Sequence, residues 1–95
     1  ITAWEVGMLA MKGRFKSSLT PQRWFERLVA TEGLELCDLT PDVLIASSFL
    51  PGNMHRDPAD RIIVATAREY GFMVLTRDRA LLDYADQGHL AAIPC

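Results

Sequence analysis

The stretch DPADRIIVATAREYGFMVLTRD, residues 57–78, decides the fold because it combines a capped helix with an apolar strand. Asp57 is placed to cap the helix, Pro58 suits its first position, and Gly71 is placed to end it about a dozen residues later. The segment FMVLT that follows is apolar up to its threonine, which is typical of a strand buried on both faces. A helix that leads directly into a buried strand predicts an α/β fold with a parallel sheet.

The rest of the chain continues this alternation of helices and short strands. One helix is expected at residues 2–12, where Thr2 and Glu5 have the spacing of a capping box. Three more are expected at residues 21 to about 30, 41–50 and 79–87, with Thr20, Thr40 and Asp78 as their respective N-caps. The expected strands are LELCDL (34–39), FMVLT (72–76) and LAAIP (90–94). Together they predict one α/β domain over residues 1–95, with a short parallel sheet flanked by helices.

Length and composition place the chain among small globular proteins. Its 95 residues are 49% apolar and 23% charged, and its longest apolar stretches fall far short of the roughly 20 residues of a membrane helix. Cys37 and Cys95 lie far apart without a Cys/His cluster, so neither a zinc site nor a disulfide framework is indicated and the reducing cytoplasm is the expected setting. His55 and His89 lack the spacing of metal ligands and are expected in loops or on the surface. A net charge of −2 excludes a protein that grips nucleic acid by bulk positive charge.

Four acids each have a local explanation as helix-start residues. Asp57 and Asp78 are placed as N-caps, Asp60 as a favourable charge in the first turn, and Glu5 as the acid of a capping box. Helix capping alone would therefore account for all of them.

A second interpretation comes from where two of these acids fall in an α/β fold. Ligands of parallel sheets lie outside the carboxyl ends of the strands, and Asp78 follows FMVLT at that end. Asp60 begins the helix that leads into the same strand, so both acids are expected at one edge of the sheet. Mg²⁺ and Mn²⁺ prefer carboxylate oxygens and can turn water into a nucleophile toward a phosphodiester. Such an ion would also offset the repulsion between an acidic protein and RNA.

At this point the sequence resembles a known family, the PIN-domain ribonucleases, and most closely the VapC-type toxins of bacterial toxin–antitoxin pairs. The resemblance runs from about Thr2 to Pro94. It rests on the W-E pair at Trp4–Glu5, the H-x-D-P-x-D-R block at 55–61, the small residues Ala65 and Ala67, and T-x-D at 76–78, with Leu82 and Tyr84 beyond. It implies a PIN-like α/β sandwich. The family's first strand, which is apolar and ends in a further aspartate, is missing, so the chain is expected to be an N-terminally truncated PIN-like domain.

Carried over residue by residue, the resemblance places the catalytic, metal-binding carboxylates on Glu5, Asp60 and Asp78. Thr76 is expected to orient the site, and Arg61 to be structural or to contact a partner. The implied function is a Mg²⁺- or Mn²⁺-dependent endoribonuclease that hydrolyses RNA with activated water. The implied partners are RNA, a cognate antitoxin that blocks the site, and a second copy in a homodimer. This activity is expected of the complete domain rather than of the chain as it stands.

Two other functions are compatible with the same residues. A degenerate or fragmentary PIN-like domain could act as a non-catalytic binding module. A phosphate-handling enzyme such as a phosphatase would also use acids at strand ends with Mg²⁺. The phosphatase is disfavoured, because neither a nucleophilic Asp motif nor a Gly-rich phosphate loop is present in the sequence.

Overall fold

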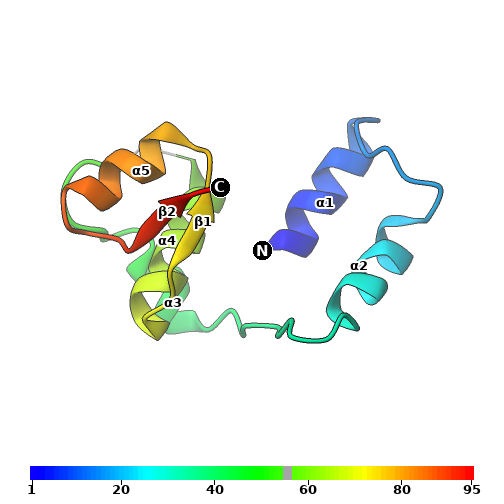
Figure 1. Ribbon diagram of the computed structural model, residues 1–95, viewed down its shortest axis with the longest axis horizontal. Coiled ribbons are helices and arrows are strands. Elements are labelled where there is room, and N and C mark those ends of the chain that lie inside the picture. The colour runs from blue at the N-terminus through cyan, green and yellow to red at the C-terminus, as the bar shows by residue number, and fades with distance from the viewer. Residues whose placement is uncertain (55–56) are drawn as a thin grey trace. The chain divides into compact units, whose positions relative to one another are not determined.

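The computed structural model describes residues 1–54 and 57–95, which form two compact units, Ile1–Asp38 and Leu39–Cys95. Each unit is described by itself (Figure 1). The single domain expected over residues 1–95 stays a prediction. No helix in the described part of the chain is both long and apolar enough to cross a membrane.

The first unit contains two helices, α1 (Thr2–Met11) and α2 (Pro21–Val29). Helix α2 begins as predicted, because the Thr20 hydroxyl accepts a hydrogen bond from the Arg23 amide at 3.2 Å. The capping box predicted for α1 is wrong. Its N-cap is Ile1, which makes no side-chain cap bond, and the Ile1 carbonyl accepts from the Glu5 amide at 3.0 Å. Thr2 is already the first helical residue, so its hydroxyl is not at the capping position.

The segment LELCDL, residues 34–39, does not form the predicted strand. It is irregular, and Leu36 is 67% exposed. A strand depends on hydrogen bonds to a neighbouring strand. In the described residues the sheet has only two strands, and both belong to the second unit. Apolar alternation alone therefore could not make this segment a strand.

The second unit combines three helices with the two-stranded sheet. In chain order its elements are α3 (Pro41–Ala46), α4 (Pro58–Tyr70), β1 (Val74–Thr76), α5 (Arg79–Asp86) and β2 (Ala92–Pro94). Strands β1 and β2 pair in parallel, with Val74 opposite Ala92 and Thr76 opposite Pro94. The predicted α/β fold with a short parallel sheet is thus confirmed.

Within the described part of the second unit, the core covers one face of the sheet. Val74 and Ala92 pack against the core, whereas Leu75, between Val74 and Thr76, is 65% exposed. The prediction that FMVLT is a fully buried strand is therefore wrong, and Phe72 and Met73 are exposed as well. A strand can be buried on both faces only when a layer lies on each side of the sheet.

The core of the second unit is centred on Tyr84, which is 1% exposed. Its hydroxyl donates a hydrogen bond to the Pro51 carbonyl, and its ring lies 5.0 Å from the His89 ring. The other buried members of the cluster are Met54, Val64, Ala67, Leu81 and Leu90. His89 lies in the loop after α5, as predicted, whereas His55 falls outside the described residues.

We expect the free energy of unfolding to fall at high pH because of the Tyr84 phenol. Burial raises the pKa of its phenol above the ordinary 10.0, against the opposing charges of Arg68 and Arg61. The fold therefore favours the neutral phenol. This contribution is fully present below the unfolded pKa of 10.0 and is lost as the pH rises through the folded pKa. Thermal unfolding midpoints measured across this range should fall more steeply for the wild type than for Tyr84→Phe. Equal slopes would contradict the assignment.

Candidate metal centre

The first acidic group lies at the start of α4. Asp57 is the N-cap, and its Oδ1 accepts from the amides of Ala59 at 2.9 Å and Asp60 at 3.3 Å. Pro58 occupies the first turn, and Gly71, in the left-handed conformation at φ 71°, ends the helix. The predicted cap is confirmed. Asp60 lies in the first helical turn and is half-buried, whereas Asp57 is exposed.

The second acidic group lies where β1 passes into α5. The Thr76 hydroxyl accepts from the Asp78 amide at 3.0 Å. Asp78 caps α5, with Oδ1 accepting from the Ala80 amide at 2.8 Å. Thr76 thus fixes the backbone that presents the exposed Asp78 carboxylate. The orienting role expected for Thr76 at a metal site stays a prediction.

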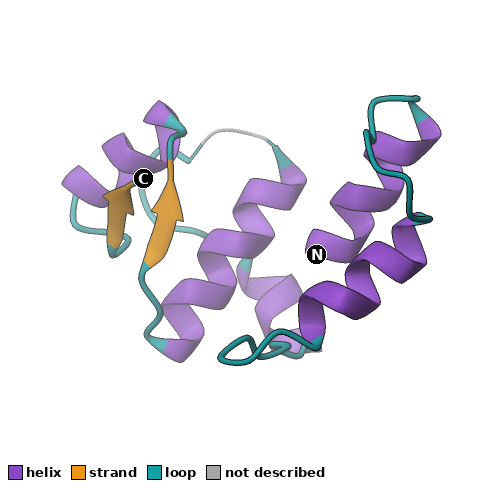
Figure 2. Ribbon diagram, turned by 45° about the vertical axis from the view of Figure 1, so that its right-hand side comes forward, coloured by secondary structure: helices purple, strands orange, loops and turns teal. Residues whose placement is uncertain are grey.

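The chain direction brings these two helix starts to the same side of the second unit. Helix α4 runs toward the end at which β1 begins, and β1 runs back toward the side where α4 starts (Figure 2). Helix α5 then begins beyond the carboxyl end of β1. The positive end of each helix dipole lies at its helix start. Both helix starts lie on one side of this unit, and the role of Asp60 and Asp78 as neighbouring metal ligands stays a prediction.

The chemistry of these donors suits a small, hard cation. Mg²⁺ is commonly held by one or two carboxylates together with substrate phosphate, and the second unit supplies Asp60 and Asp78 for this. Glu5 lies on α1 in the first unit. Across residues 1–54 and 57–95, no three His, Cys, Asp or Glu side chains gather into a group that could hold a metal ion.

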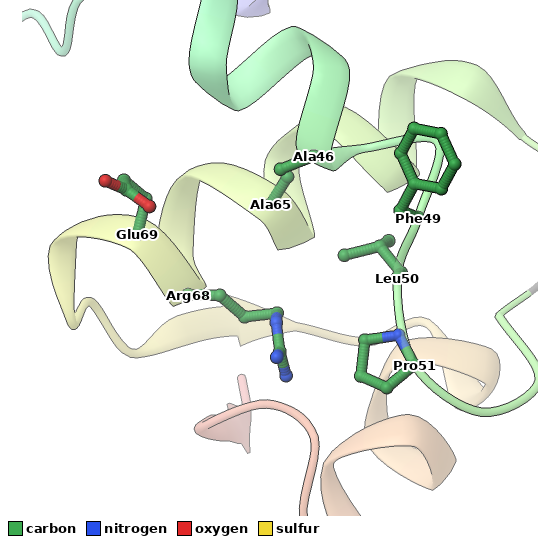
Figure 3. Close-up of a pocket in the computed structure, with 7 residues that line it drawn as sticks. All are labelled: Ala46, Phe49, Leu50, Pro51, Ala65, Arg68 and Glu69. Atoms are coloured by element: carbon green, nitrogen blue, oxygen red, sulfur yellow. The ribbon is translucent and has the colours of Figure 1, made fainter.

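Two cavities of the second unit lie away from these acids. One, of about 270 Å³, is lined by apolar residues that include Phe49 and Pro51, with Arg68 and Glu69 at its side (Figure 3). The other, of about 490 Å³, lies along the end of α4 and the loop at His89. Neither is lined by an acid of the predicted set. The candidate centre at the two helix starts is thus separate from both of these cavities.

Arg61 donates hydrogen bonds to backbone carbonyls of the second unit, which is a structural role. Its Nε donates to the Ser47 carbonyl at 2.8 Å and its Nη1 to the Met54 carbonyl at 3.1 Å. The comparable bond from Tyr84 to Pro51 was not predicted. A backbone carbonyl is present at every residue, so the sequence carries no signal for which carbonyl a side chain will reach.

The family model described as PIN domain matches residues 1–87. Ribonuclease VapC22 of Mycobacterium tuberculosis (strain ATCC 25618 / H37Rv) is 35% identical over 81 residues, which cover 85% of this chain and 61% of the relative. The chain thus spans about three fifths of the length of that relative. No solved structure shows a significant match. The resemblance to PIN-domain ribonucleases of the VapC type is confirmed, and because the family model spans α1 to α5, including both acid-bearing helix starts, the chain belongs to the PIN domain family.

Proposed function

We propose that the full-length protein is a metal-dependent endoribonuclease and the toxin of a toxin–antitoxin pair. The observation that carries the proposal is the PIN domain match across both acid-bearing helix starts. The 35% identity to a protein named Ribonuclease VapC22 supports RNA as the substrate. A net charge of −2 supports a site that holds RNA locally, since bulk positive charge is not available.

In this proposal, Asp60, Asp78 and Glu5 hold Mg²⁺ or Mn²⁺. When bound, the ion supplies a nucleophilic water at neutral pH and stabilises the charge that develops on the phosphodiester. A divalent cation binds carboxylates in their ionised state. Thr76 holds the Asp78 backbone through its hydroxyl. The exposure of Asp78 leaves the site open to an RNA strand.

The partners follow from the same family membership. We propose a cognate antitoxin that covers the acids, a homodimer as the working assembly, and the cytoplasm as the setting. Cys37 and Cys95 are free and exposed, which suits a reducing compartment.

The test is RNA cleavage by the full-length protein. We expect cleavage of single-stranded RNA with Mg²⁺ or Mn²⁺, loss of cleavage with EDTA, and recovery when Mn²⁺ is added in excess, because the water is activated only when the ion is bound. Product ladders on a denaturing gel would report all three conditions. Cleavage that persists in EDTA would exclude the metal mechanism. RNA binding without cleavage under any metal would instead support the non-catalytic binding module.

A further inference from the structure

The segment of residues 47–54, between α3 and the start of α4, is held by side chains from both helices that carry the predicted acids of the second unit. From α4, Arg61 donates to the carbonyls of Ser47 and Met54. From α5, the buried Tyr84 donates to the carbonyl of Pro51. Two side chains thus donate hydrogen bonds to three backbone carbonyls of one short segment.

A close contact restrains the same segment from a third direction. Gly52 adopts φ +67°, and a Cβ built there would lie 2.8 Å from Nε2 of His89. The His89 ring in turn lies against Tyr84. The backbone of the segment therefore packs directly against the loop that follows α5, and it has little room to shift toward that loop.

These contacts link the two helix starts. Arg61 directly follows Asp60 on α4, and Tyr84 lies on α5, the helix capped by Asp78. Packing in the shared apolar core is non-directional, whereas hydrogen bonds set both a distance and a direction. The hydrogen-bonded segment is consequently the part of this unit best suited to define how far apart α4 and α5 begin.

We propose that Arg61 and Tyr84 are positioning residues that set the separation of Asp60 and Asp78 through the 47–54 segment. Their contribution is to the affinity of the acid pair for a divalent cation. The inference rests on the proposed function, in which these two acids hold the metal. Supporting residues of metal sites commonly change affinity by about 10- to 100-fold when they are removed.

The test is Mn²⁺ binding to the full-length protein without RNA, followed by the loss of the electron paramagnetic resonance signal of free Mn²⁺. Arg61→Met removes the donors but keeps an unbranched side chain, and Tyr84→Phe removes only the hydroxyl. Thr66→Val is the matched control, since Thr66 also lies on α4 and its hydroxyl donates to a carbonyl, that of Ile62 in the same helix, and not to the 47–54 segment. All variants are measured well below their unfolding midpoints.

We expect Mn²⁺ binding about tenfold weaker in Arg61→Met and Tyr84→Phe and unchanged in Thr66→Val. Equal weakening in all three would overturn the inference, because a general loosening of the unit would then explain it. Binding that is lost in Asp60→Asn but intact in Arg61→Met and Tyr84→Phe would also overturn it and leave the metal site standing. A wild type that binds no Mn²⁺ would reject the metal site itself. Should Arg61→Met not fold, Tyr84→Phe alone decides.

Discussion

Asp60→Asn and Asp78→Asn, each in the full-length protein, are expected to lower the rate of RNA cleavage at least about a hundredfold, since even supporting residues of metal sites cost 10- to 100-fold. Each substitution keeps the size of the side chain but removes a charge that the metal needs. Asn at 78 still offers an oxygen to the Ala80 amide, so α5 remains capped. The measurement is the initial cleavage rate with Mn²⁺, together with the thermal unfolding midpoint, which should move little.

Asp83→Asn provides the matched control for these variants. Asp83 is an exposed acid on α5, and its ion pair with Arg79 is long, at 3.9 Å. Exposed pairs of this kind contribute little to stability. This variant should cleave RNA like the wild type. Full activity in both Asp60→Asn and Asp78→Asn would reject the assignment of these acids to the metal centre.

Tyr84→Ala is expected to have the largest effect on stability of any single substitution considered. Removing a large buried aromatic ring costs roughly 3–5 kcal/mol of the free energy of unfolding. Tyr84→Phe keeps the ring and loses only the hydrogen bond to Pro51, which costs about 1 kcal/mol. Urea unfolding of the full-length protein, followed by circular dichroism, measures both. The difference between the two variants separates ring packing from the hydroxyl.

Tyr70 offers the comparison for that experiment. It is 42% exposed and stacks on Phe72 with ring centroids 5.6 Å apart. Because the Tyr70 ring is already in contact with water, Tyr70→Ala should cost about 1 kcal/mol or less. A loss in Tyr84→Ala no larger than the loss in Tyr70→Ala would contradict the placement of Tyr84 at the centre of the core.

The helix starts are the part of the fold that the sequence predicts best. Thr20, Thr40, Asp57 and Asp78 each cap the helix expected of them. A cap acts within one turn, through a hydrogen bond to an amide two or three residues away, so the local sequence is sufficient to specify it. The capping box predicted at Thr2 is wrong by a single residue, because the helix begins one residue earlier than that box requires.

The strands show where local pattern stops being sufficient. LELCDL and FMVLT have similar apolar character, yet only the second contains a strand, because only β1 has a partner among the described residues. Burial depends equally on other parts of the chain, and it is the helices on one face of the sheet that bury Val74 and leave Leu75 exposed. Partners and covering layers are distant in sequence, and a short window cannot reveal them.

The candidate site divides in the same way. Residue types and their place in an α/β pattern indicated the acids at 60 and 78, because chemistry belongs to the side chain itself, and the family resemblance added Thr76. The helix–strand order also predicted that both acids lie at one edge of the sheet, and the tertiary structure has α4 and β1 running in opposite directions in the second unit (Figure 2). Only the tertiary structure decided that Arg61 and Tyr84 hold the carbonyls of residues 47–54. Those contacts join side chains to backbone groups that are identical at every position, so only the folded chain selects among them.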